Sequence, residues 1–285
     1  MNPRPGEVER AFFRIAEGQV HLRMVRGTDE GKPPVILLHA SPSSSRFMVP
    51  LAQEIALVTG RTVYAPDTLG NGDSPPPAED DPEISYFADS VVRLADALGL
   101  DRFAVYGSHT GARIACELAA AFPERIEATI LDGIKEYDDE TRERIIANYA
   151  PTVKPDDHGT HMVWAFHFVR DQAIYFPHFQ RDPEHRLPGF MPPANVLHDA
   201  AIDVLKALDT YAKPYIAAFR YRALQRLPDI TGRVLLMKAE RELAVLNAAV
   251  EEMAALIPGG ETVAVASNPK AKAEAIGKFL KEMRS

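Results

Sequence analysis

The sequence predicts an α/β fold, a mostly parallel sheet flanked by helices, with an inserted helical cap. Short apolar runs such as "PPVILLHA" alternate with segments of helical spacing, the order typical of parallel strands joined by helices. From about residue 135 to 228 this rhythm is interrupted by a stretch rich in proline, aromatic residues and histidine. We therefore expect a core formed by residues 1–134 and 229–285, and a helical cap formed by residues 135–228.

The expected strands are apolar runs bounded by turn residues. "AFFRIAE" and "VHLRMVR" flank Gly18 and predict a hairpin near the N-terminus. Most of the later runs are almost entirely apolar, which is typical of strands buried on both faces of a sheet. They are "PPVILLHA", "RTVYAP", "RFAVYG", "IEATILDG", "RVLLMKAE" and "ETVAVA".

The expected helices show capping residues or helical periodicity. "SPSSSRFMVPLAQEIALV" begins with cap-forming serines, and the segment 84–98 has apolar residues at 84, 87, 88, 91, 92, 95 and 98. A helix from Gly111 to about Phe122 follows the run "VYG". Two more are expected in "AVLNAAVEEMAALIP" and "KAEAIGKFLKEM", and "YAKPYIAAFRYRALQRLP" in the cap predicts a helix kinked at Pro214.

Composition excludes several classes of partner. The 285-residue chain carries a net charge of −8, which argues against nucleic acid or an anionic membrane as the main partner. The single cysteine, Cys116, excludes an internal disulfide framework, and "MNPRPGEVER" lacks the apolar core of a signal peptide. We therefore expect a cytoplasmic monomer or homodimer that binds a small molecule.

Four local motifs, in order, resemble those of the α/β-hydrolase superfamily. "LLHASPSSS" is similar to the family's oxyanion loop, and "APDTLGNGDS" is similar to its Asp-x-x-Gly-x-Gly-x-Ser turn. "YGSHTGA" stands where the family has its nucleophile elbow, and "VLLMKAERE" resembles the strand that delivers the acid of the catalytic triad. The resemblance covers about residues 10 to 283 and implies the α/β-hydrolase fold.

The elbow motif carries a histidine in place of the nucleophile. The turn requires small residues two places before and two places after its central residue. Gly107 and Gly111 meet this requirement around His109, whereas a turn centred on Ser108 would place Tyr106 and Thr110 at the small positions. We therefore expect His109 at the nucleophile position and Ser108 to point elsewhere.

The other two triad positions also depart from the family pattern. Glu242 stands where the resemblance implies an Asp, and its longer arm can do the same orienting task. The loop that should deliver the triad histidine is reduced to "SNPK", and no histidine follows His198. The usual Ser-His-acid mechanism is therefore excluded at its usual positions.

These substitutions together suggest a different mechanism. An imidazole at 109 projects farther than a serine and is long enough to reach Glu242, which predicts a His–Glu dyad suited to proton transfer. The backbone N–H groups of Ser41 and Thr110 are the expected oxyanion donors. We expect cofactor-independent chemistry, hydrolysis or a lyase-type reaction, on a small apolar or aromatic carbonyl or ester compound. The alternative is a ligand-binding or sensor protein without catalysis.

Four other residues are candidates for the same site. Asp132 is an alternative acidic partner for His109. His39, Trp164 and Phe168 are candidate substrate-binding residues, although His39 is usually structural in the family and the two aromatic residues also suit the core of a cap. The histidines at 158, 161, 167 and 178 lack the spacing of a metal site with a carboxylate ligand, so we expect no metal.

Overall fold

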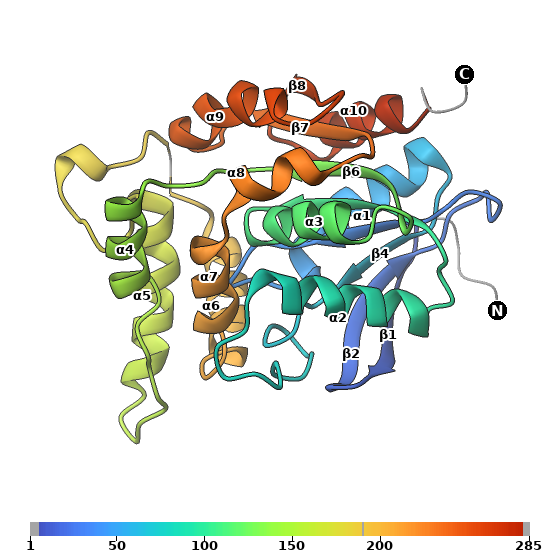
Figure 1. Ribbon diagram of the computed structural model, residues 1–285. Coiled ribbons are helices and arrows are strands. Elements are labelled where there is room, and N and C mark those ends of the chain that lie inside the picture. The colour runs from blue at the N-terminus through green and yellow to red at the C-terminus, as the bar shows by residue number, and fades with distance from the viewer. Residues whose placement is uncertain (1–5, 190, 282–285) are drawn as a thin grey trace.

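Eight strands form one sheet in the computed structural model, which describes residues 6–189 and 191–281 (Figure 1). Their order is β1-β2-β4-β3-β5-β6-β7-β8; β2 pairs antiparallel with β1 and β4, and the other pairs are parallel. The predicted mostly parallel sheet is confirmed. The strands are β1 (Val8–Ile15), β2 (Gly18–Val25), β3 (Val35–Leu38), β4 (Val63–Pro66), β5 (Phe103–Ser108), β6 (Ile126–Asp132), β7 (Val234–Ala239) and β8 (Glu261–Val265). Residues 1–5, which belong to the N-terminal stretch expected not to be a signal peptide, lie outside the described residues.

Helices cover both faces of the sheet. Successive side chains of a strand point to opposite faces, so an apolar strand presents apolar groups on both. Phe103 and Val105 of β5 pack into one apolar cluster with α2 (Ile84–Ala97), α3 (Thr110–Ala121) and α9 (Ala244–Ala255). Ala104 and Tyr106 point to the opposite face, into a second cluster with α1 (Ser45–Thr59) and α10 (Pro269–Lys281). Both faces of β5 are therefore buried, as its apolar sequence predicts.

The segment between β6 and β7 is helical and has an apolar core of its own. Its elements are α4 (Asp139–Asn148), α5 (Thr160–Ile174), the short 3-10 turn η1 (Pro183–His185), α6 (Ala194–Lys206), α7 (Ala212–Arg220), α8 (Ala223–Arg226) and the 3-10 turn η2 (Leu227–Asp229). α4, α5 and α6 stand beside the sheet in Figure 1, and buried residues of α4 to α7 form a third apolar cluster.

The helix predicted to kink at Pro214 is different in the structure. α7 begins at Ala212, so Pro214 lies in its first turn. The N–H groups of the first turn have no partner within the helix, so a proline there removes no helical hydrogen bond. The break falls instead at Tyr221 and Arg222, and α8 follows it. The prediction of a kink at Pro214 was wrong because it placed the start of the helix too early.

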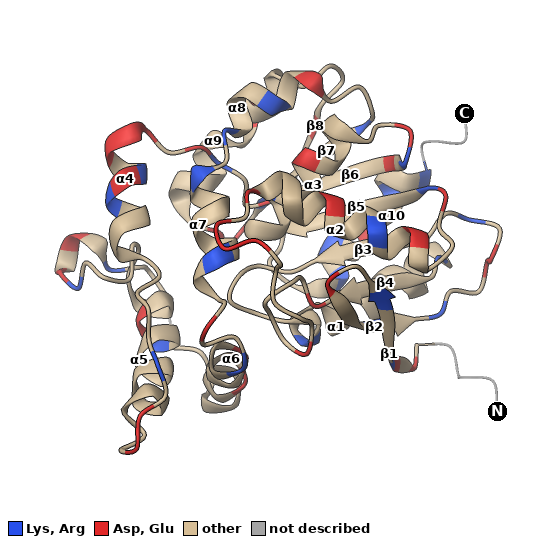
Figure 2. Cartoon of the chain, turned by 60° about the horizontal axis from the view of Figure 1, so that its bottom comes forward, with Lys and Arg blue, Asp and Glu red and all other residues tan. Residues whose placement is uncertain are grey.

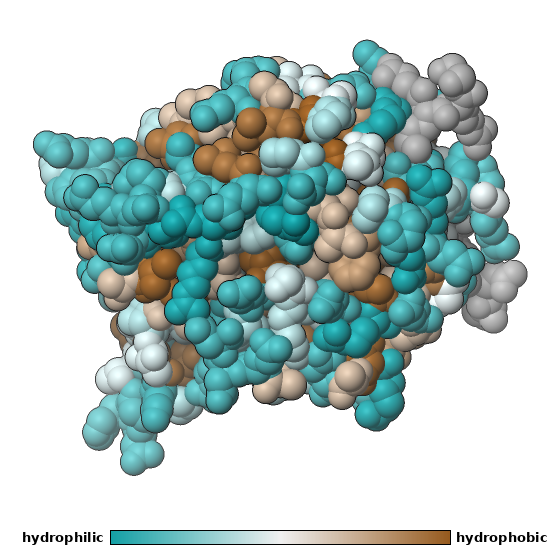
Figure 3. All heavy atoms as spheres, viewed as in Figure 1, coloured by the Kyte–Doolittle hydropathy of each residue, from teal (hydrophilic) through white to brown (hydrophobic). Residues whose placement is uncertain are grey.

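The surface carries charges of both signs. Acidic and basic residues are interspersed along the chain in Figure 2, and many of them form ion pairs, such as Arg46 with Asp199 and Arg125 with Asp96. The face seen in Figure 3 is largely hydrophilic with small apolar patches. Among the described residues, no helix has both the length and the apolar character needed to cross a bilayer.

The carboxyl ends of four neighbouring parallel strands lie at one edge of the sheet. β3, β5, β6 and β7 are adjacent, and the residues that follow them include Ser41, His109, Gly133 and Glu242. In open α/β sheets ligands bind beyond this edge. The topology therefore brings the predicted site residues together from positions far apart in the sequence.

Candidate active site

His109 occupies a sharp turn between β5 and α3. It has φ 50° and ψ −103°, and it is the only non-glycine residue with a positive φ in the described part of the chain. The two flanking glycines are needed for close packing. A Cβ on Gly107 would lie 2.1 Å from the carbonyl oxygen of Gly111, and a Cβ on Gly111 would lie 2.2 Å from that of Leu38. The turn is therefore centred on residue 109.

Ser108 is the last residue of β5 and is not among the residues that line the cavity described below. It pairs in register with Asp132 of β6 and forms a side-chain hydrogen bond with Tyr106. Its side chain therefore belongs to the layer between the sheet and the helices α1 and α10.

Glu242 follows β7 and meets the ring of His109. The Nε2 atom of His109 lies 3.2 Å from Oε2 of Glu242, whose side chain is only 11% exposed. Oε1 accepts a hydrogen bond of 2.8 Å from the N–H of Leu243. Burial by itself raises the pKa of this carboxyl, but the hydrogen bond and charge of His109, the Leu243 N–H and the charge of Lys272 together hold its pKa below the usual value. Glu242 is therefore ionised at neutral pH.

Gly133, which we did not single out from the sequence, lies against this pair. It has φ +80°, and a Cβ there would stand 3.1 Å from Oε2 of Glu242 and 3.2 Å from Cε1 of His109. Any larger residue would press on both side chains. The signal available in the sequence was the glycine directly after the run "IEATILD", at the carboxyl end of a strand.

A cavity of about 330 Å³ opens beside His109. One part of its wall comes from the core and includes Ser41, Thr110 and Arg113. The other part comes from the inserted segment and its junctions with the core and is largely aromatic: Tyr137, Tyr149, Phe176, Tyr215 and Phe219. The cavity therefore combines an apolar, aromatic wall with a few polar groups, which is typical of small-molecule sites.

The predicted oxyanion donors line this cavity. Neither the N–H of Ser41 nor that of Thr110 has a hydrogen-bond partner among the described residues. The side-chain Oγ of Ser41 is also buried without a partner there. Because buried polar groups are normally paired, these groups are available to a bound molecule.

Asp132 has partners other than the ring of His109. Its carboxylate accepts a hydrogen bond of 2.5 Å from the hydroxyl of Tyr106 and forms an ion pair with Lys272. Only its backbone carbonyl meets His109, accepting a hydrogen bond of 2.9 Å from the His109 N–H. Of the two acids predicted as alternatives, Glu242 is therefore the one beside the imidazole.

His39 is buried under the site and does not line the cavity. Its Nδ1 lies 2.6 Å from the carbonyl oxygen of Ala40, and its Nε2 accepts a hydrogen bond of 3.0 Å from the N–H of Thr68. Burial lowers the pKa of this histidine, so the neutral form is favoured. These contacts connect two loops, and the substrate-binding role of His39 stays a prediction that this cavity does not support.

Trp164 and Phe168 also lie away from the cavity. Their rings stack with centroids 4.8 Å apart and pack against Tyr211 in the core of the inserted segment. Neither residue lines this cavity, and the substrate contact stays a prediction for both. They are one helical turn apart in α5, so they share a face, and that face is turned toward α6 and α7.

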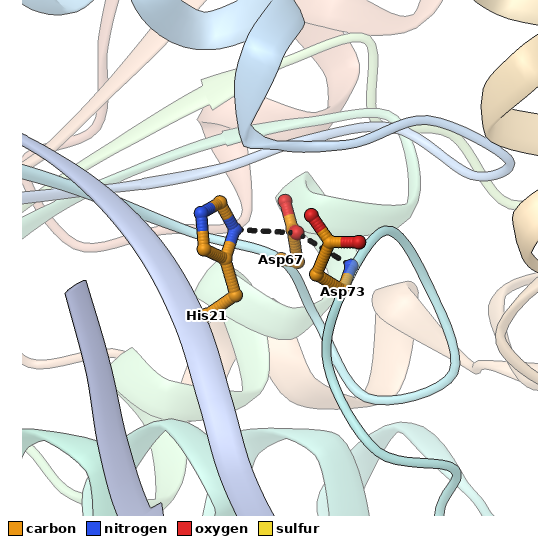
Figure 4. A group of neighbouring side chains, drawn as sticks. All are labelled: His21, Asp67 and Asp73. Carbon is orange, nitrogen blue, oxygen red and sulfur yellow. Dashed lines mark hydrogen bonds and ion pairs between the residues drawn. The ribbon is translucent and has the colours of Figure 1, made fainter. Parts of the chain in front are cut away.

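A group of His21, Asp67 and Asp73 has the composition of a metal site (Figure 4). Each side chain is already paired within the protein. Nδ1 of His21 lies 2.8 Å from Oδ2 of Asp67, and Nε2 accepts a hydrogen bond from Arg10. Asp67 also accepts the N–H groups of Ser45 and Asp73, and Asp73 pairs with Arg10 and Lys206. The group therefore ties the Gly-rich turn after β4 to β1 and β2.

Comparison with known sequences agrees with this architecture. Residues 33–268 match the family model described as alpha/beta hydrolase fold. Proline iminopeptidase from Lactobacillus delbrueckii subsp. bulgaricus is 28% identical over 132 residues, which are 45% of this chain and 44% of that protein. The match thus spans less than half the length of that relative. The putative carbamate hydrolase RutD from Caulobacter vibrioides is 24% identical over 276 residues, 92% of this chain and 95% of that protein.

Solved structures show the same fold. Epoxide hydrolase A from Mycobacterium thermoresistibile superposes with a TM-score of 0.74 at 17% identity, over 96% of this chain and 98% of that one. At this level of identity the similarity concerns the arrangement of the elements. The reaction has to be inferred from the residues at the carboxyl edge of the sheet.

Proposed function

Since the chain belongs to the α/β-hydrolase fold family, we propose that it is a cofactor-independent enzyme that hydrolyses a small apolar or aromatic carbonyl or ester compound with His109 as acid–base group. The observation that carries the proposal is the 3.2 Å separation between His109 Nε2 and Glu242 Oε2 beside the cavity. A carboxylate at Nε2 favours the tautomer with its proton on Nε2. Nδ1 is then the nitrogen free to accept a proton.

The reaction follows from these groups. Nδ1 of His109 removes a proton from water while the water oxygen attacks the substrate carbonyl carbon. The charge that develops on the carbonyl oxygen is stabilised by the N–H groups of Ser41 and Thr110. The tetrahedral intermediate then collapses: the bond between the carbonyl carbon and the leaving group breaks, and the imidazolium gives its proton to the leaving group, while Glu242 keeps the ring oriented. The products are an acid and the protonated leaving group, and His109 is neutral again.

Two contributions determine the expected rate acceleration. One positioned acid–base group contributes about 10²–10⁴-fold. Each oxyanion donor contributes about 10²–10³-fold in related acyl-transfer sites. Neither contribution depends on a serine nucleophile. The names of the two sequence relatives, a peptidase and a putative carbamate hydrolase, support bond hydrolysis over the lyase-type alternative.

Turnover of a panel of aryl esters, enol esters and lactones tests the proposal. We expect the wild-type protein to hydrolyse at least one of them, and His109→Ala to lose about 10²–10⁴-fold in kcat/KM while remaining folded. Ser108→Ala is the matched control and should keep activity. A fluorophosphonate probe should label none of the three proteins.

Two outcomes would contradict the proposal. Labelling at Ser108, with activity lost in Ser108→Ala, would indicate a serine nucleophile. Tight binding of panel compounds without turnover, equal in wild type and His109→Ala, would favour a ligand-binding or sensor protein.

A further inference from the structure

Arg113 is a buried cation on the wall of the cavity. It lies in the first turn of α3, is 5% exposed, and lines the cavity together with His109 and Thr110. A buried charge is costly unless an opposite charge or several hydrogen bonds compensate it. The groups that this guanidinium contacts therefore indicate its role.

Within the described residues, those partners are two backbone carbonyls. One terminal nitrogen donates a hydrogen bond of 3.0 Å to the carbonyl oxygen of His109, and the other donates one of 2.7 Å to that of Lys135. A guanidinium has five N–H donors, so three remain. No carboxylate in the described part of the chain forms an ion pair with Arg113.

The acidic residues nearby already have partners. Glu136 accepts hydrogen bonds from Arg222 and from the N–H of Leu224. Glu117 pairs with Arg226, and Glu242 with His109. Among the described residues, no Asp or Glu lines the cavity. Arg113 is therefore the residue of its wall that carries a permanent charge.

A polar group without a partner lies on the same wall. Ser41 is 6% exposed, and its Oγ has no hydrogen-bond partner among the described residues. The rings of Tyr137, Phe176 and Phe219 line the same cavity. The cavity wall thus combines hydrogen-bond donors and a positive charge with aromatic surface.

We propose that Arg113 binds a carboxylate of the substrate, so that the substrate is an apolar or aromatic carbonyl compound carrying an acid group. A planar guanidinium with free donors matches a carboxylate in shape and charge. The identity of this cavity as the substrate site rests on the proposed function; the preference for an anion rests on Arg113 alone. Because Arg113 also holds the carbonyl of His109, the bound carboxylate lies next to the catalytic turn.

A pair of probes of the same shape and different charge tests the proposal. Phenylacetate and phenylacetamide are titrated into wild type and His109→Ala by calorimetry at about pH 7.5 and low salt. We expect phenylacetate to bind about ten- to hundredfold more tightly than phenylacetamide, the range for a hydrogen bond to a charged group. His109→Ala should keep this preference, so loss of catalysis and loss of anion binding are read separately.

Two variants of Arg113 complete the test. Arg113→Met should abolish the preference for phenylacetate, and Arg113→Lys should retain part of it, since a lysine keeps the charge without the planar fork. Thermal unfolding checks that each variant is folded. Equal affinity of the wild type for the two probes, or no measurable binding of either, would overturn the proposal, as would a preference that survives in folded Arg113→Met.

Discussion

Single residues at the elbow set the distance between the imidazole and its carboxylate. His109 is held in an unfavourable backbone conformation, which only a well-packed surrounding can maintain. The contact between His109 and Glu242 depends equally on a residue with no side chain, Gly133, which leaves room for both groups. The geometry of this pair is thus determined as much by the lack of a side chain at position 133 as by the two side chains themselves.

Gly133→Ala should impair the dyad. The added Cβ would meet Oε2 of Glu242 at 3.1 Å and the His109 ring at 3.2 Å, at a backbone φ of +80°. We expect a loss of about 10–100-fold in kcat/KM, since small displacements of catalytic groups are costly, and a loss of about 1–2 kcal/mol in stability from the positive φ. Gly99→Ala is the matched control, because Gly99 has φ +70° with no atom within 4 Å of an added Cβ.

The control variant separates the two effects. Both variants should lose similar stability in chemical denaturation, and only Gly133→Ala should lose activity. Full activity in Gly133→Ala would mean that the contact between His109 and Glu242 tolerates displacement and is not essential to catalysis.

Glu242 should contribute to stability in a pH-dependent way. Its pKa in the folded protein is below the usual 4.5, so the folded state favours the ionised form. The stabilisation is therefore fully present above about pH 4.5 and is lost as the pH falls through the folded-state pKa. We expect the difference in free energy of unfolding between wild type and Glu242→Gln to be larger at pH 7 than at pH 3.

Denaturant unfolding at the two pH values measures this difference. Glu240→Gln, at an exposed position two residues earlier, is the control variant. A difference for Glu242→Gln that is unchanged or grows toward pH 3 would contradict the assigned direction of the shift.

At the scale of elements, the first turn of α10 connects to the carboxyl end of β6. The loop after β8 is short, and Lys272 extends from α10 to the carboxylate of Asp132 at the end of β6. Asp132 is 1% exposed and also bonds Tyr106. Lys272 thus compensates a buried acid, and its charge also helps to lower the pKa of Glu242.

Lys272→Met should destabilise the protein strongly. Removing one partner of a buried ion pair leaves the other charge unpaired, at a cost of about 3–5 kcal/mol. We expect Lys272→Met/Asp132→Asn to recover part of this loss, because the carboxylate is then absent. Lys270→Met, at an exposed position in the same turn, is the control. Chemical denaturation measures the free energy of unfolding of all three variants. A loss below about 1 kcal/mol in Lys272→Met would contradict the role of Lys272 as the partner of a buried charge.

The strands and most of the helices could be predicted from the sequence because their signals are local. Buried runs such as "RFAVYG" and the periodic helix at 84–98 need no knowledge of distant residues. The partner of Lys272 could not be predicted, since that contact joins residues 140 positions apart. Pro214 was misread because its effect depends on where the helix begins.

At the scale of the whole molecule, the core supplies polar groups and the inserted segment supplies much of the aromatic wall. The elbow, the acid position and the expectation of an inserted segment followed from motif spacing along the chain. Which aromatic residues face the cavity could not be predicted in this way. Trp164 and Phe168 are as suitable in composition as Tyr137 or Phe219, and only the packing of α5 against its neighbours turns them inward.

The fold brings His109, which follows β5, next to Glu242, which follows β7, although the whole inserted segment separates them in the sequence. Nitrogen-15 NMR of the His109 side chain, assigned by its absence in His109→Ala and recorded at about pH 9, where imidazoles are neutral, tests this pairing without any substrate. The dyad predicts a proton on Nε2 and a lone pair on Nδ1, with the tautomer balance shifting in Glu242→Gln. A proton on Nδ1, or a spectrum that Glu242→Gln leaves unchanged, would contradict the central role given to the His109–Glu242 pair.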